Sequence, residues 1–354
     1  MDSWPSLRVG PALEVGGVRR IALFRALHLG DFLCSVPALR ALRERFPEAE
    51  IALIGLPWAR SLLGRYPYVD RLLEFPGYRG LEGVTWDRER SLRFLVEARR
   101  RRYDLAIQMH GDGRVSNGFV AQLGARVSLG YRPEDPGRPR ELDLELDWER
   151  SDHEIHRWLR LVSVLGAMGT AKLEWPLGPA DWLELERVAG NAGIDLERPM
   201  IGLHPGGKDP AKRWPPERFA FVADVLAAEL DAQVIVTGGH EELQVAEQVA
   251  AEMRGGRGAH LLAGQTSLGG LAALLAQLRL LVTNDTGPSH MAAALGTPSV
   301  VLFGPTDPAR WAPLDAGRHR SLWSGRGNPI SQIPVERVVE ESLALVERWA
   351  YLTY

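Results

Sequence analysis

A chain of 354 residues is long enough for about two domains, because single hydrophobic cores usually stop growing at roughly 250–300 residues. Its composition, 45% hydrophobic and 25% charged, is ordinary for a globular protein. A formal net charge of −3 gives no indication of a nucleic-acid-binding surface, so nucleic acid is not an expected partner.

Cysteine content and hydropathy further restrict the class of protein to which this sequence can belong. Cys34 is the single cysteine, which excludes an internal disulfide framework and a cysteine-built metal site. No apolar run of 18 residues is present, and the first twenty residues lack the charged start and apolar core of a signal peptide. We therefore expect a cytoplasmic protein.

The first half of the chain alternates apolar strands with helices. Apolar runs predict strands at 19–27, 50–55, 69–75 and 103–111. Amphipathic patterns predict helices at 35–46, 57–66, 87–102 and 153–166. Continuous apolar strands that alternate with helices indicate a parallel sheet covered on both faces. Residues 133–150 read as a proline- and acid-rich connection, although the alternation in "DLELD" (143–147) suggests a strand.

The same alternation restarts after about residue 180. Strands are predicted at 199–206, 232–239, 279–285 and 298–305, and helices at 215–230, 241–252, 268–278 and 334–352. Two βα arrays in tandem predict an α/β protein built from two Rossmann-like domains. A dehydrogenase is not indicated, because no G-x-G-x-x-G follows the first strand.

Three polar loops follow the strands of the second half, at 204–215, 238–242 and 284–290. In open parallel sheets, ligands bind beyond the carboxyl ends of the strands, and helix N-termini there favour phosphate. Glycines allow the backbone to approach a phosphate closely, lysines add charge, and an acid can hold ribose hydroxyls. The predicted nucleotide diphosphate site consists of Gly206, Gly207, Lys208, Lys212, Glu241, Asp285, Thr286, Gly287 and His290.

Each of these features also has a purely structural interpretation. Asp285 or Thr286 could be a helix N-cap, with Pro288 in the first turn. Glu241 could simply complement a helix dipole, and His290 could be a buried structural histidine. The arginine excess favours no partner, but two of the three lysines of the chain, Lys208 and Lys212, lie within five residues. The convergence of three such loops favours the binding site.

Two loops of the first half carry candidate cleft residues. Because Pro37 suggests a helix start near residue 36, residues 28–35 are expected to form a tight loop that contains Asp31. The loop "QMHGDGRVSN" (108–117) ends a later strand. Its candidate acceptor-side residues are His110, Asp112, Arg114 and Asn117.

Three segments together resemble the signatures of glycosyltransferase family 9, the ADP-heptose:lipopolysaccharide heptosyltransferases. They are "LGDFLCSVPALRALRERFPEAEIALIG", "HPGGKDPAKRWPPERFA" and "TNDTGPSHMAAALGTPSVVLFGPTDPARWAP", in the family's order over nearly the whole chain. The resemblance implies a GT-B fold, two Rossmann-like domains whose parallel sheets face a central cleft. The implied organisation is an acceptor-side domain at 1–178, a nucleotide-sugar domain at 179–333, and a helix at 334–354 that crosses back to the first domain.

The resemblance also implies an inverting, metal-independent transfer from an NDP-sugar, with no cofactor and no metal site. Asp31 corresponds to the proposed general base and Lys212 to the lysine that neutralises the diphosphate. Glu241 corresponds to the ribose-binding acid. The remaining motif residues, which would grip the diphosphate and the sugar, are Asp285, Thr286, Gly287 and His290. The implied donor is ADP-heptose, and the implied acceptor is a saccharide or a lipid-linked saccharide such as lipopolysaccharide core.

Alternative functions remain open at this stage. Gly206 and Gly207 stand where core heptosyltransferases often have hydroxyl residues, so a different NDP-sugar and a different acceptor are alternatives, as is a non-catalytic nucleotide-sugar-binding protein. An NDP-sugar 2-epimerase would need cleft acids and histidines in a pattern that is absent. Arginine runs at 93–102 and 40–45 suggest peripheral contact with the cytoplasmic face of the inner membrane, or simply solvated helix faces.

Overall fold

The computed structural model describes residues 17–350 except 136 and 257, and it divides the chain into two compact units. The units are Met1–Lys172 and Leu173–Tyr354. The division therefore falls between residues 172 and 173, whereas the sequence placed it between 178 and 179. The short segment before the next helix belongs to the second unit, and it buries Leu173 and Trp175.

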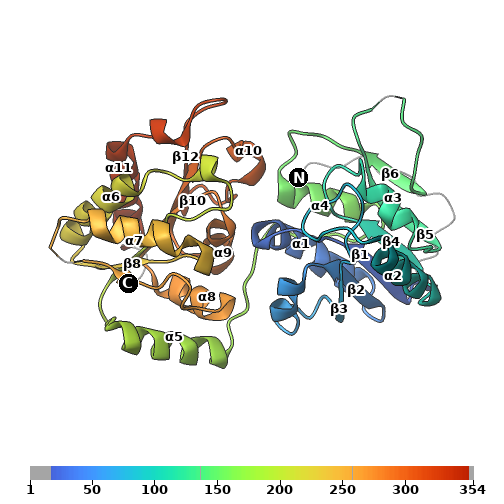
Figure 1. The fold of residues 1–354 in the computed structure, drawn as a ribbon, viewed down its shortest axis with the longest axis horizontal. Coiled ribbons are helices and arrows are strands. Elements are labelled where there is room, and N and C mark those ends of the chain that lie inside the picture. The colour runs from blue at the N-terminus through green and yellow to red at the C-terminus, as the bar shows by residue number, and fades with distance from the viewer. Residues whose placement is uncertain (1–16, 136, 257, 351–354) are drawn as a thin grey trace. The chain divides into compact units, whose positions relative to one another are not determined.

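The first unit is a parallel sheet with helices on both faces (Figure 1). Its strands are β1 (Arg20–Phe24), β2 (Glu50–Gly55), β3 (Arg71–Glu74), β4 (Leu105–Gln108), β5 (Val127–Arg132) and β6 (Leu144–Asp147). Its helices are α1 (Leu29–Arg45), η2 (Pro57–Leu62), α2 (Arg88–Arg100), α3 (Ser116–Ala121) and α4 (Glu154–Ser163). The strand order is β3-β2-β1-β4-β5-β6, with every pairing parallel.

The first helix corrects the expected loop at 28–35. α1 begins at Leu29 and continues through Pro37, so Asp31 lies in its first turn. Every residue from Phe32 to Leu39 is buried. Burial of this continuous segment outweighs the local preference of proline for a helix start.

The second unit has the same architecture (Figure 1). Its strands are β7 (Met200–His204), β8 (Gln233–Val236), β9 (His260–Leu261), β10 (Leu280–Asn284), β11 (Ser299–Phe303) and β12 (His319–Trp323). The α-helices are α5 (Pro179–Ala192), α6 (Pro216–Glu229), α7 (Leu243–Glu252), α8 (Leu268–Gln277), α9 (Gly287–Leu295), α10 (Pro308–Trp311) and α11 (Val335–Ala350). Three short 3-10 helices are η3 (Pro210–Lys212), η4 (His240–Glu242) and η5 (Ile330–Gln332).

Both sheets have the doubly wound Rossmann order. In the second sheet the order is β12-β11-β10-β7-β8-β9, which repeats the connectivity of the first. In such sheets the chain reverses direction between the first and fourth strands, and ligands bind at this switch point. The switch points are the carboxyl ends of β1 and β4 in the first unit, and of β7 and β10 in the second.

The last helix packs within the second unit. Val338, Leu345 and Val346 of α11 belong to the hydrophobic core that also contains α6 and β11. The described part of the helix is thus anchored on its own sheet. Over the described parts of the chain, no helix is both long and apolar enough to cross a membrane.

Candidate active site

The loops after β7 and β10 are joined by one buried side chain at the switch point of the second sheet. The Asn284 Nδ2 group donates to the carbonyl oxygens of Pro205 (2.9 Å) and Gly206 (3.0 Å). Its Oδ1 accepts the N–H of Trp214 at 3.1 Å. Asn284 is fully buried, so it fixes the glycine loop beside the helix start that follows β10. No local sequence signal predicts this role of Asn284.

Lys212 and Asp285 form an ion pair at the same edge. Lys212 ends η3, and its Nζ lies 2.9 Å from Oδ2 of Asp285, the residue directly after β10. The lysine side chain is 30% exposed and the aspartate 5% exposed. The amine is therefore held at the end of β10 yet remains open to solvent on one side, where it could contact an anionic ligand.

The start of α9 lies next to this pair. Thr286 is the N-cap in extended conformation, Gly287 begins the helix, and Pro288 occupies its first turn. The Ser289 hydroxyl donates to the Thr286 carbonyl at 2.7 Å. First-turn N–H groups lack intrahelical acceptors and carry the positive end of the helix dipole, so this helix start favours an anionic ligand.

His290 lies one turn further into α9. The residue is 4% exposed, and its ring centroid is 6.2 Å from that of Trp311, with the rings inclined at 67°. Trp311 ends α10, in the "GPTDPARW" segment that follows β11. β10 and β11 are neighbours, so the end of this segment lies close to the helix start after β10.

Two adjacent acids at the end of β8 have different surroundings. Glu241 is exposed in η4, whereas the Glu242 carboxylate accepts the Gly239 N–H at 2.7 Å and lies 3.6 Å from Nε2 of His204. Burial lowers the pKa of His204, although Glu242 opposes the shift, so His204 is neutral at pH 7 and the contact is not an ion pair. Glu242 is not among the residues predicted from the sequence, although it is the second acid of "GGHEE" (238–242).

Glu242 also explains why a glycine occupies position 206. A Cβ added to Gly206 would lie 2.3 Å from the carboxylate carbon of Glu242. We expect Gly206→Ala to displace that carboxylate from the Gly239 N–H, at a cost of about 1–2 kcal/mol. Urea unfolding measures this loss in the free energy of unfolding. Because both changes act on one contact, adding Gly206→Ala to the Glu242→Ala variant should lower the free energy of unfolding by only a small further amount.

Gly190→Ala is the matched control for this substitution. Gly190 lies in α5, and nothing approaches its added Cβ within 4 Å. Alanine there should leave the free energy of unfolding unchanged or raise it by about 0.5–1 kcal/mol. Equal effects at positions 190 and 206 would contradict the role given to Glu242.

The switch point of the first sheet places Asp31 beside a buried arginine. Asp31 lies in the first turn of α1 with its side chain 24% exposed. The Arg25 side chain, 2% exposed, follows β1, and its Nη2 lies 3.9 Å from Oδ1 of Asp31. A partly exposed carboxylate at a helix start, at the carboxyl edge of a parallel sheet, is well placed to act on a bound substrate.

The loop at 108–117 divides into buried and exposed residues. His110 stacks on Phe24 (centroids 4.7 Å apart), and its Nδ1 accepts the Ala26 N–H at 3.2 Å. Asn117, 1% exposed, donates to the Tyr131 carbonyl at 2.8 Å. The other two candidates, Asp112 and Arg114, pair with each other at 3.6 Å near the surface. The structure therefore leaves only the latter two accessible to a ligand.

His110 makes the stability of the first unit sensitive to acid. Burial, with a smaller effect of Arg25, lowers the pKa of His110 from 6.5 to about 4. The unfolded chain then binds more protons between those pH values, so the free energy of unfolding should fall by roughly 3 kcal/mol as the pH drops from 6.5 to 4. Burial likewise lowers the pKa of His319 to about 4.

We expect His110→Asn to flatten this pH dependence, because asparagine does not titrate in this range. Urea unfolding between pH 7 and 4.5 measures the slope. The exposed His156→Asn serves as the control and should keep the wild-type slope. The same slope in all three proteins would contradict a neutral buried His110.

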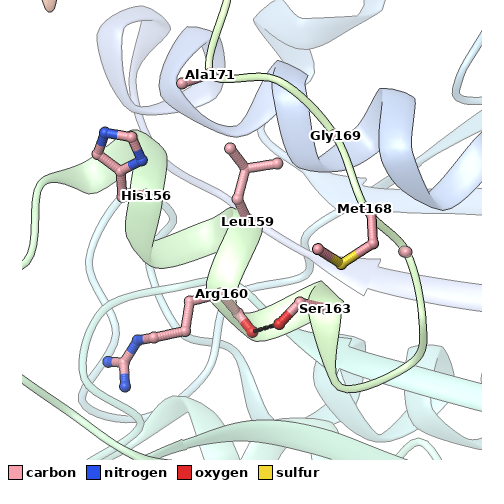
Figure 2. Close-up of a pocket in the computed structure, with 8 residues that line it drawn as sticks. His156, Leu159, Arg160, Ser163, Met168, Gly169 and Ala171 are labelled. Atoms are coloured by element: carbon pink, nitrogen blue, oxygen red, sulfur yellow. Dashed lines mark hydrogen bonds between the residues drawn. The ribbon is translucent and has the colours of Figure 1, made fainter. Parts of the chain in front are cut away.

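Two hollows of the first unit lie apart from the predicted residues. One, of about 150 Å³, lies between α4 and residues 167–171 and is lined by His156, Leu159 and Met168 among others (Figure 2). The other, of about 610 Å³, lies at the ends of β5 and β6. Neither includes a candidate residue. Among the described residues, no group of three or more His, Cys, Asp or Glu side chains is placed to hold a metal ion.

Two Rossmann-like units in tandem correspond to the GT-B class of fold, which the solved structure of an E. coli heptosyltransferase shares. The family model described as glycosyltransferase family 9 (heptosyltransferase) matches residues 92–330. Lipopolysaccharide heptosyltransferase 2 of Escherichia coli K12 is 31% identical over 346 residues, which cover 90% of this chain and 96% of that protein. The chain belongs to glycosyltransferase family 9, which confirms the resemblance of its three motifs.

Solved structures agree with this assignment. The structure of E. coli ADP-heptose lps heptosyltransferase II superposes with a TM-score of 0.74 at 27% identity. The superposition covers 94% of this chain and 99% of the E. coli chain. A family 9 glycosyltransferase from Veillonella parvula DSM 2008 gives a TM-score of 0.77 at 23% identity, with 93% and 97% coverage. The second similarity supports the fold alone.

Proposed function

We propose that this glycosyltransferase moves a heptose from ADP-heptose to a lipopolysaccharide acceptor, without a metal ion. The supporting observation is the switch point of the second sheet, where the Lys212–Asp285 pair, the start of α9 and the Asn284-fixed glycine loop meet. A nucleoside diphosphate needs positive charge and backbone N–H groups, and this edge provides both. The similar E. coli protein of solved structure is an ADP-heptose lipopolysaccharide heptosyltransferase, which supports the same donor and acceptor here.

In the proposed reaction, Asp31 removes the proton from an acceptor hydroxyl as its oxygen attacks the anomeric carbon of the sugar. The bond between that carbon and the diphosphate oxygen breaks, and ADP leaves with the bonding electrons. Attack opposite the leaving group inverts the anomeric centre. Lys212 and the N-terminus of α9 stabilise the charge that develops on the diphosphate.

The remaining residues have proposed contacts with the donor. Gly206 and Gly207 present backbone N–H groups to the diphosphate, with Lys208 beside them in the same loop. Glu241, exposed at the end of β8, holds the ribose hydroxyls. The contacts with the diphosphate and the sugar come from Asp285, Thr286, Gly287 and His290. On the acceptor side, Asp112 and Arg114 are the two candidates with accessible side chains.

A nucleotide panel and a transfer assay test the proposal. ADP should raise the melting temperature of the protein more than UDP or GDP, because a ligand bound only by the folded state stabilises it by mass action. Purified protein should then transfer heptose from ADP-heptose to lipopolysaccharide from an E. coli strain that lacks heptosyltransferase 2. A preference for UDP or GDP would reject heptose as the sugar. Binding of ADP with no transfer to any saccharide would favour a binding protein.

We also propose peripheral contact with the cytoplasmic face of the inner membrane through α2. Leu92 and Val96, 50% and 52% exposed, lie one turn apart on this helix. Exposed arginines flank them, including Arg93 and Arg99. Apolar side chains within a basic face favour an anionic lipid surface. The arginines of both helices also bond within the first unit: Arg93 pairs with Glu89, and Arg43 of α1 pairs with Asp70. The Arg93 side chain is nevertheless 71% exposed, whereas that of Arg43 is 18% exposed.

Vesicle cosedimentation measures this contact. The protein should sediment with phosphatidylglycerol vesicles and not with pure phosphatidylcholine vesicles, because the attraction is partly electrostatic. The double variant Leu92→Ser/Val96→Ser should bind the anionic vesicles at least several-fold more weakly, since it loses the apolar contact. Wild-type binding by this variant would place the membrane contact elsewhere.

A further inference from the structure

Arg25, the first residue after β1, is a fully buried cation. Its side chain is 2% exposed, although Arg25 lies at the switch point, at the carboxyl end of the strand. Removing a guanidinium from water costs several kcal/mol unless its donors and its charge are compensated. The partners that compensate it therefore indicate what the arginine does.

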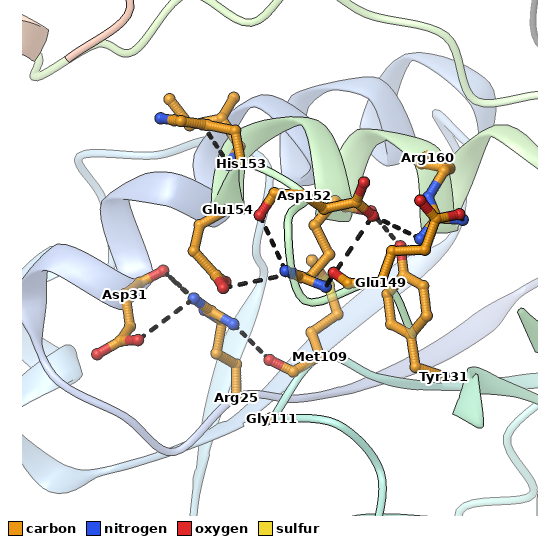
Figure 3. A network of polar contacts seen from close by, with 12 residues as sticks. Arg25, Asp31, Met109, Gly111, Tyr131, Glu149, Asp152, His153, Glu154 and Arg160 are labelled. Atoms are coloured by element: carbon orange, nitrogen blue, oxygen red, sulfur yellow. Dashed lines mark hydrogen bonds and ion pairs between the residues drawn. The ribbon is translucent and has the colours of Figure 1, made fainter. Parts of the chain in front are cut away.

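The guanidinium joins three elements (Figure 3). Its Nε donates to the backbone carbonyl of Asp31 at 2.8 Å, and Nη2 donates to the same oxygen. Its Nη1 donates to the carbonyl of Met109 at 2.5 Å, just beyond β4. The guanidinium also lies over the ring of Trp158, with its carbon 4.6 Å from the centroid. One side chain thus ties the ends of β1 and β4 to the first turn of α1.

The charges around Arg25 complete this arrangement. Burial lowers the pKa of Arg25, and Asp31 and Glu154 raise it in turn, so the guanidinium remains charged at neutral pH. Glu154 begins α4 and is 3% exposed; it also accepts a hydrogen bond from Nε of Arg157 at 3.3 Å. Glu154 therefore supplies a buried counter-charge to Arg25, in addition to the partly exposed carboxylate of Asp31 (Figure 3).

We propose that Arg25 is a positioning residue for the transfer reaction: it holds the first turn of α1, and with it the Asp31 carboxylate, where that carboxylate accepts the proton of the acceptor hydroxyl. The inference rests on the proposed role of Asp31 as the base. Asp31 has no other buried cation within 4 Å among the described residues, so its backbone and its side chain depend on the same guanidinium. A misplaced catalytic group costs about 10²-fold in rate.

The test compares Arg25→Met and Arg25→Lys with the wild type in the heptose transfer assay described above. Arg25→Met should lower kcat by about 10²-fold. Arg25→Lys keeps the charge, but one amine cannot serve both carbonyls, so it should lose about tenfold. The affinity for ADP should stay within about twofold, because the proposed nucleotide site lies in the other unit. Wild-type kcat in either folded variant would overturn the proposal. If Arg25→Met does not fold, the kcat of Arg25→Lys alone tests the proposal.

Arg43→Met is the matched control. Arg43 also lies in the first unit, donates to two backbone carbonyls, those of Pro47 and Ala49, and pairs with Asp70. It lies in the last turn of α1, away from Asp31. A loss of kcat equal to that of Arg25→Met would show general destabilisation and overturn the positioning role.

A double variant separates this inference from the proposed role of Asp31. If Arg25 acts through Asp31, then Asp31→Asn/Arg25→Met should be no slower than Asp31→Asn alone. A further loss of tenfold or more in the double variant would overturn the positioning role while leaving the base intact. Wild-type activity in Asp31→Asn alone would instead reject Asp31 as the base.

Discussion

Asp31→Asn should lower kcat for heptose transfer by about 10²–10⁴-fold, the usual contribution of a general base. The substitution keeps the size of the side chain and removes its ability to accept a proton. Asp31 is partly exposed in the first turn of α1, and Arg25 bonds its backbone carbonyl, so the amide should fit without loss of structure. Initial rates at saturating donor and acceptor measure kcat.

ADP binding provides the internal check on Asp31→Asn. The variant should show the same ADP-dependent rise in melting temperature as the wild type, because the proposed nucleotide contacts all lie in the second unit. Glu97→Gln is the control, an exposed carboxylate of α2 whose 3.8 Å pair with Arg100 is also exposed. A kcat for Asp31→Asn within tenfold of the control would remove Asp31 as the base.

Lys212→Met should abolish the ADP-dependent rise in melting temperature and lower kcat by about 10²–10³-fold. The amine is proposed to stabilise the leaving diphosphate, and loss of one such electrostatic contact has an effect of this size. The structure places Lys212 Nζ 2.9 Å from a 5% exposed Asp285, so the substitution also leaves a buried carboxylate without its cation. The melting temperature without ligand should therefore fall as well.

A second substitution separates these two effects of Lys212→Met. In Lys212→Met/Asp285→Asn the uncompensated charge is gone, so the melting temperature without ligand should recover while ADP binding stays lost. Lys172→Met is the control, because this lysine is the exposed last residue of the first unit. ADP binding retained by Lys212→Met would move the diphosphate site away from η3 and α9.

The sequence was most informative where structure depends on local pattern. Apolar runs separated by amphipathic helices predicted two parallel sheets, because buried strands of an α/β fold need continuous hydrophobic residues. The strand in 143–147 was also read from alternation alone, and β6 confirms it. The first turn of α1 shows the limit of this reasoning, since Pro37 indicated a later helix start and burial of residues 32–39 overrode it.

The sequence by itself determined the fold class, the family and the loops at the strand ends, because glycines, prolines and polar residues mark those loops locally. Only the tertiary structure decided which side chains contact one another. Lys212 pairs with Asp285 across 73 positions, and Asn284 reaches the Gly206 carbonyl across 78. It also separated buried His110 from exposed Arg114. Such contacts depend on which strands are neighbours in the sheet, and no local pattern in the chain encodes that order.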